Sequence, residues 1–165
     1  MSILQRYIGT KLINAVPMTR QQYNDFRGWQ LPADENGDDP GFLVEYLDGG
    51  KANTPQYAGY VSWSPADVFE RAYRPTTGMS FGQAIEAMKA GAKVARAGWN
   101  GLGMFAYYVP AASYPAQTGV AKAFYGEGAL VPYRAYMALK TAQGDVATWS
   151  PSGSDALADD WLIVE

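Results

Sequence analysis

The first half of the chain combines short apolar runs with polar, Pro- and Gly-rich stretches. Three runs predict strands: residues 7–18, 42–47 and 60–64. We expect the first strand to end at Pro17, and Thr19 is placed to cap a short helix over residues 20–27. Pro65 predicts a second helix that reaches Tyr73, because proline is favoured at the first helical position.

The second half begins with a helix signal and continues with strands. Ser80 and Gln83 have the spacing of a capping box, and Gly91 is expected to end the helix that follows. Its apolar stripe comprises Phe81, Ala84, Ile85 and Met88. Five runs predict strands: residues 93–97, 104–109, 133–141, 146–149 and 161–164. The stretch 110–132 is rich in Ala, Pro and Gly without a clear period, which predicts a long loop or mobile flap.

Together these elements predict an α+β fold of antiparallel sheets and short helices, arranged as two small units. Pro75, two threonines and Gly78 mark the boundary between the units. We therefore expect a small N-terminal domain over residues 1–76, to which no role can be assigned, and a second domain over residues 77–165.

Composition limits the chemistry that the chain can perform. Hydrophobic residues make up 48% of the 165 positions, with 12 tyrosines, 5 tryptophans and 6 phenylalanines, which is typical of a packed globular protein. Cysteine and histidine are both absent, which excludes disulfides, thiolate nucleophiles, Ser-His-Asp triads and the usual zinc sites. We therefore expect no catalytic residues, no metal site and no cofactor.

Charge and hydropathy limit the partners. The net charge of −3 argues against a binder of DNA or RNA polymers, which needs a basic surface. No apolar run approaches the ~20 residues of a membrane span, and the N-terminus lacks a signal-peptide core. These features predict a soluble intracellular protein without a membrane partner.

The nine residues 96–104 are the most informative stretch, because three glycines surround Trp99 and Asn100. Asn100-Gly101 predicts a tight hairpin turn, since both residue types tolerate positive φ. A tryptophan in such a turn either offers its ring to a flat ligand at the rim of the sheet or folds back onto the core. Both interpretations stay open at this point.

A second tryptophan, Trp149, ends the last predicted hairpin. If the two indoles lie close together they can sandwich or flank a purine, and stacking contributes about 1–3 kcal/mol per base. Further candidate contacts are Asn100, Gly101, Met104, Thr141, Ser152 and Asp155. Asp155 is suited to ribose hydroxyls or an adenine amine, although a first-turn Asp also favours a helix dipole. Arg96 and Lys140 are the candidate charges near phosphates, and Asp160 is expected to secure a helical turn.

Several segments of the second unit resemble a small phage family founded by the second Thoeris anti-defence protein. The resemblance covers about residues 79–165 and rests on segments 80–84, 93–104, 140–144 and 149–161 in the same order. It implies a non-enzymatic sponge that binds a cyclic ADP-ribose signal (glycocyclic ADP-ribose) and keeps it uncleaved, so that the Thoeris effector is not activated. It also implies a homotetramer, uptake of cyclic oligonucleotides by some members, and action in the cytoplasm of the infected bacterial host.

Two other functions remain as alternatives. A phosphodiesterase would need Asp155, Asp159 and Asp160 around magnesium, although the last two point in different directions on a helix. A phage structural or assembly protein without a nucleotide ligand would use the many tyrosines at protein interfaces.

Overall fold

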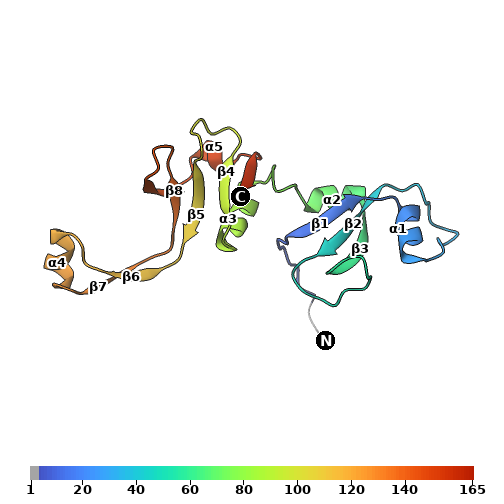
Figure 1. Ribbon diagram of the computed structural model, residues 1–165, viewed down its shortest axis with the longest axis horizontal. Coiled ribbons are helices and arrows are strands. Elements are labelled where there is room, and N and C mark those ends of the chain that lie inside the picture. The colour runs from blue at the N-terminus through green and yellow to red at the C-terminus, as the bar shows by residue number, and fades with distance from the viewer. Residues whose placement is uncertain (1–3) are drawn as a thin grey trace. The chain divides into compact units, whose positions relative to one another are not determined.

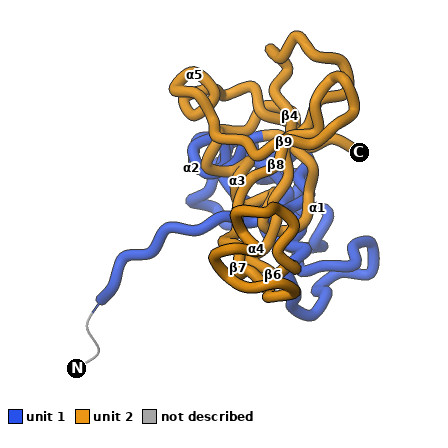
Figure 2. Tube along the Cα trace, turned by 90° about the vertical axis from the view of Figure 1, so that its left-hand side faces the viewer, with its two compact units in different colours: residues 1–74 blue, residues 75–165 orange. Residues whose placement is uncertain are grey.

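The computed structural model describes residues 4–165 and confirms an α+β fold of antiparallel sheets and short helices (Figure 1). By the contacts among its residues, the chain divides into two compact units, residues 1–74 and 75–165 (Figure 2). Each unit has its own cluster of buried hydrophobic side chains, so each is described by itself.

The first unit has a three-stranded antiparallel sheet with strand order β1-β2-β3 and two helices. Its elements are β1 (Ile13–Pro17), α1 (Arg20–Arg27), β2 (Gly41–Tyr46), β3 (Tyr60–Pro65) and α2 (Ala66–Ala72). Thr19 caps α1 as predicted, since its side chain accepts a hydrogen bond from the Gln22 N–H. Tyr23, Leu43 and Val61 form the buried cluster of this unit.

Two predictions for the first unit were wrong in detail. The first strand begins at Ile13 rather than at residue 7, because its partner β2 ends at Tyr46, directly opposite Ile13. Pro65 is the last residue of β3 and the N-cap of α2, so this helix begins one residue later than predicted. The elements themselves are those that the apolar runs predict.

The second unit is built on a five-stranded antiparallel sheet with strand order β10-β4-β5-β8-β9. Its strands are β4 (Lys93–Arg96), β5 (Phe105–Val109), β8 (Tyr136–Lys140), β9 (Val146–Trp149) and β10 (Trp161–Val164). Helix α3 (Phe81–Lys89) is held by the predicted capping box of Ser80 and Gln83 and packs against β10, β4 and β5. Met79 pairs with Trp161 at the outer side of β10. The short helix α5 (Gly153–Ala156) precedes β10.

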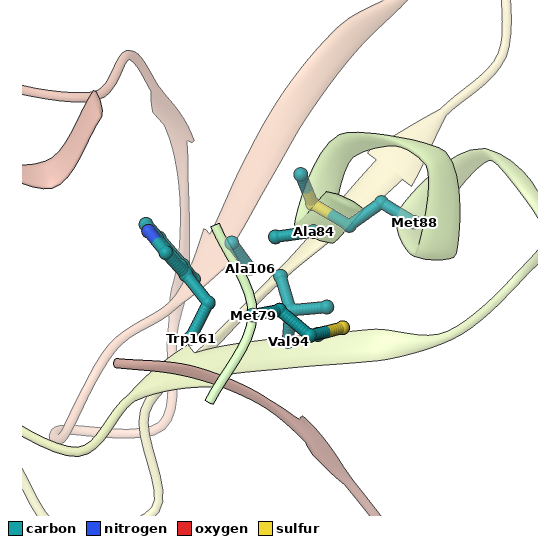
Figure 3. Close-up of a cluster of buried hydrophobic side chains, with 6 residues drawn as sticks. All are labelled: Met79, Ala84, Met88, Val94, Ala106 and Trp161. Carbon is teal, nitrogen blue, oxygen red and sulfur yellow. The ribbon is translucent and has the colours of Figure 1, made fainter. Parts of the chain in front are cut away.

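One face of this sheet forms the core with α3. The fully or nearly fully buried residues are Met79, Ala84, Met88, Val94, Ala106 and Trp161 (Figure 3). Residues that lie opposite each other in an antiparallel pair point to the same face, and neighbours along a strand point to opposite faces. Val94 pairs with Ala106 on the α3 face. Lys93 and Phe105, their chain neighbours, therefore point away from α3.

Residues 110–132 are not a structureless loop, contrary to the prediction. They contain β6 (Ala112–Pro115), α4 (Gly119–Tyr125) and β7 (Leu130–Tyr133), which can be followed in Figure 1. Val109 pairs with Tyr136, and Ala112 pairs with Tyr133, so β6 and β7 continue the β5–β8 hairpin without a change of register. We call residues 110–135 the arm. Pro115 in β6 and Pro132 in β7 hide this pattern in the sequence, because proline is a signal against a strand.

Candidate functional site

The connection between β4 and β5 is wider than the predicted tight turn. No described residue other than glycine has a positive φ, so Asn100 does not adopt the conformation that a type I′ turn needs, and Gly103 has the positive φ, of 67°. The first part of the connection is tied to the residue before β10: Ala97 N–H donates to the Asp160 carbonyl, and Gly98 N–H donates to its carboxylate. These long-range bonds add to a local turn, in which the Trp99 N–H donates to the Arg96 carbonyl at 3.2 Å.

Three indole rings meet beside α3 in what we call the tryptophan cluster, Trp99, Trp149 and Trp161. The Trp99 and Trp149 ring centroids lie 5.8 Å apart at an interplanar angle of 78°, and Trp99 meets Trp161 at 5.4 Å and 78°. Trp161 is fully buried, whereas Trp99 and Trp149 are partly buried and pack against the core. Edge-to-face rings cannot sandwich a base between them, so only the flanking arrangement remains available.

Asp155 is the polar anchor of this cluster. Its Oδ1 accepts hydrogen bonds from Trp99 Nε1 at 3.2 Å and from Arg96 at 2.9 Å. Its Oδ2 accepts from the backbone N–H of Ser152 at 3.1 Å and from the Ser152 hydroxyl at 2.7 Å. Burial raises the pKa of Asp155, but the hydrogen bonds from Ser152, Arg96 and Trp99 outweigh it and lower the pKa to about 2. The carboxylate is therefore ionised and engaged by protein donors on both oxygens.

Arg96 completes a charged network with two carboxylates. It binds Asp160 through Nε at 2.7 Å and Asp155 through Nη1 at 2.9 Å, and these hydrogen bonds raise the pKa of its guanidinium. The sequence suggested that Asp160 secures a helical turn, which is wrong. Asp160 is the residue before β10, and its carboxylate accepts hydrogen bonds from Arg96 and from the Gly98 N–H.

The structure also separates the two predicted phosphate-binding charges. Arg96 lies opposite Trp161 on the α3 face, whereas Lys140 lies opposite Phe105 on the other face.

The remaining predicted residues lie around the two hairpin ends. Asn100 is exposed, and within residues 4–165 its side-chain amide has no hydrogen-bond partner. Gly101 lies under Met104: a Cβ on this glycine would be 1.9 Å from the Met104 sulfur. The Thr141 hydroxyl donates to Asp145 within the β8–β9 turn. Ser152 caps α5 and lies 2.9 Å from the Ser154 hydroxyl.

A depression elsewhere on the second unit includes residues that the sequence analysis missed. It has a volume of about 290 Å³. Its lining comprises Met88, Gly91, Ala92, Lys93, Phe105, Tyr107, Tyr108, Lys140 and Val146. Of these, only Met88, Gly91 and Lys140 were singled out from the sequence. The signal that could have found the others is the strand register, which places Lys140 directly opposite Phe105.

Two absences apply to the described part of the chain. No group of three or more carboxylates that could hold a metal ion occurs in residues 4–165. Nor does any helix there have both the length and the hydropathy needed to cross a membrane.

Comparison with known proteins identifies the second unit. The family model of the Thoeris anti-defense 2-like domain, Tad2-like, matches residues 79–164. The chain belongs to this Tad2-like family. Thoeris anti-defense 2 of Bacillus phage SP01 is 38% identical over 89 residues, which cover 53% of this chain and 97% of that protein. Membership of the Tad2-like family supports a phage anti-defence role, carried by the unit that holds the tryptophan cluster and the depression.

Proposed function

We propose that this protein binds glycocyclic ADP-ribose and keeps it uncleaved, so that the signal does not reach the Thoeris effector. The observation that carries the proposal is the Tad2-like match over residues 79–164. We extend the proposal to cyclic oligonucleotides as further ligands and to the cytoplasm of the infected bacterial host as the place of action. DNA and RNA polymers and membranes are not partners in this proposal, and no cofactor is required.

A non-catalytic mechanism agrees with the residues available. The chain has no histidine and no cysteine, which removes the commonest acid–base and nucleophilic groups. Asp155 and Asp160, two of the three carboxylates considered for a phosphodiesterase, are both ion-paired with Arg96. A sponge acts stoichiometrically and needs a slow off-rate, and a nanomolar Kd corresponds to about −12 kcal/mol.

The tryptophan cluster and its surroundings can supply part of that free energy. We propose that the partly exposed rings of Trp99 and Trp149 flank a base and that Asn100 binds a polar group of the ligand through its unpartnered amide. Gly101, Met104, Thr141 and Ser152 complete the candidate surface. Asp155 acts here mainly by holding the Trp99 indole in place.

Retention of intact ligand tests the proposal. The protein is incubated with cyclic ADP-ribose isomers, free ligand is removed, the protein is heated, and the released material is analysed by mass spectrometry. We expect an unchanged cyclic nucleotide at a stoichiometric amount. A linear or hydrolysed product would contradict sequestration, and the absence of any nucleotide would favour a structural or assembly role.

A further inference from the structure

Two lysines of the second unit differ from its ion-paired cations. Lys89 pairs with Glu86, Arg96 with Asp155 and Asp160, and Lys122 with Glu127. Lys93 donates instead to the main-chain oxygen of Glu165 at 2.8 Å, and Lys140 donates to the Gly103 carbonyl at 3.2 Å. Within residues 4–165, neither lysine forms an ion pair with a side-chain carboxylate.

Both lysines line the same depression of about 290 Å³, and its lining contains no acidic residue. The Lys93 ammonium lies 5.5 Å from the centroid of the Phe105 ring. Lys140 is the direct cross-strand partner of Phe105. Lys93 and Lys140 therefore lie on β4 and β8, the two strands that border Phe105 on β5, and Met88, Gly91 and Ala92 bring the end of α3 to the same depression.

This combination has a definite ligand chemistry. Two ammonium groups without side-chain carboxylate partners attract an anion, and charge-assisted hydrogen bonds to phosphate are among the stronger polar contacts. The rings of Phe105 and Tyr107 lie beside these cations and provide apolar surface for a flat group. The volume is near the lower limit of small-molecule pockets, which suits one ring and its phosphate rather than a larger ligand.

We propose that the depression binds a phosphate and the adjoining ring of a nucleotide, with Lys93 and Lys140 holding the phosphate oxygens beside Phe105. The inference goes beyond the proposed function, since it assigns a second nucleotide site that is separate from the one proposed at Trp99 and Trp149. It places these charges away from the tryptophan cluster, because Lys140 and Arg96 point to opposite faces of the sheet.

A charge-matched pair of variants tests the proposal. Lys93→Gln/Lys140→Gln is compared with Lys89→Gln/Lys122→Gln, which also removes two positive charges but leaves the depression intact. Kd values for cyclic ADP-ribose and for ADP are measured by calorimetry on the full chain at two salt concentrations. Thermal unfolding checks that both variants are folded. We expect the first variant to lose at least about tenfold in its affinity for ADP and most of the salt dependence of that binding, and the control to change less than about twofold.

The outcomes separate this inference from the proposed function. Equal ADP binding by the wild type and by Lys93→Gln/Lys140→Gln would overturn the lysine site, while retention of intact cyclic ADP-ribose by both would leave sequestration standing. Lysine-dependent binding of ADP without any binding of cyclic ADP-ribose would support the site and overturn the proposed ligand. If the wild type binds neither nucleotide, both proposals are wrong.

Discussion

At the scale of single residues, Asp155 connects the tryptophan cluster to the charged network that Arg96 forms with two carboxylates. Its carboxylate accepts hydrogen bonds from Trp99 and Ser152 and pairs with Arg96, and its side chain is 14% exposed. Replacing it removes an acceptor from the Trp99 indole and leaves Arg96 with Asp160 alone. The sequence predicted Asp155 as a ligand contact, and this stays a prediction; the hydrogen bonds of its carboxylate hold the Trp99 indole in place.

We therefore predict a pH-dependent loss of stability for Asp155→Asn. The lowered pKa means that the folded state favours the ionised carboxylate, so its contribution is complete above about pH 4 and is lost as pH falls through about 2. At pH 7 the variant should lose about 2 kcal/mol in the free energy of unfolding, measured by urea denaturation. The difference from wild type should shrink toward pH 2.

Asp145→Asn is the control for this experiment, because Asp145 lies in the exposed β8–β9 turn and does not contact the cluster. We expect only a small change in stability for this variant. A deficit of Asp155→Asn that stays the same from pH 7 to pH 2 would contradict the role of the ionised carboxylate.

The arm departs furthest from its sequence-based prediction, since it contains two strands and a helix in place of a loop. Its strands continue the β5–β8 hairpin in one register, so Ala111 and Arg134, between the paired segments, follow the same alignment. The buried cluster of the second unit lies on the α3 side of the sheet and includes no arm residue. The sheet should therefore fold without the tip of the arm.

Replacing residues 112–133 by Asn-Gly tests this prediction. A two-residue turn joins Ala111 to Arg134 without disturbing the pairing of Val109 with Tyr136. We expect the free energy of unfolding to change by less than about 1 kcal/mol, because no residue of the main cluster is removed. Far-UV circular dichroism and urea denaturation provide the measurement.

A matched deletion shifts the register. If Ala111 is removed together with residues 112–133, a one-residue slip turns the side chains of one strand to the wrong face of the sheet. This variant should be clearly less stable than the in-register deletion. Equal stability of the two would show that the arm does not continue the hairpin in solution.

At the scale of the whole molecule, the exposed apolar side chains of the arm are candidates for contacts between copies of the chain. Val120 and Phe124 on α4 are 83% and 81% exposed, and Tyr114, Leu130 and Tyr133 are each about half exposed or more. Exposed aromatic side chains are enriched at protein interfaces. We propose that the chain forms a homotetramer and that the arm contributes to the contacts between copies.

The variant Val120→Ser/Phe124→Ser should lower the mass of the assembly measured by light scattering after size-exclusion chromatography. The reason is that it removes two large apolar side chains from the proposed contact. Val68→Ser, at a 45% exposed valine of α2 in the first unit, is the control and should leave the mass unchanged. An unaltered mass for the double variant would exclude α4 from the interface.

Local signals in the sequence determined much of this protein. The capping box and apolar stripe of α3 and the apolar strand β10 depend on neighbours within a few residues, so they could be predicted. The absence of histidine and cysteine limited the chemistry available to the chain. Four segments of the second unit, in the same order as in the family, indicated the Tad2-like family.

Tertiary structure alone decided which side chains meet. The register of β4, β5 and β8 brings Lys93, Phe105 and Lys140 to one side of the sheet and turns Arg96 to the other. Hydrogen bonds that the Ala97 and Gly98 N–H groups donate to Asp160 hold the start of the Trp99 connection, and packing against Trp161 orients the Trp99 ring. A shift of one residue in strand pairing would reverse each of these faces while leaving every local signal unchanged. For that physical reason the elements could be predicted from the sequence and the arrangement of the site could not.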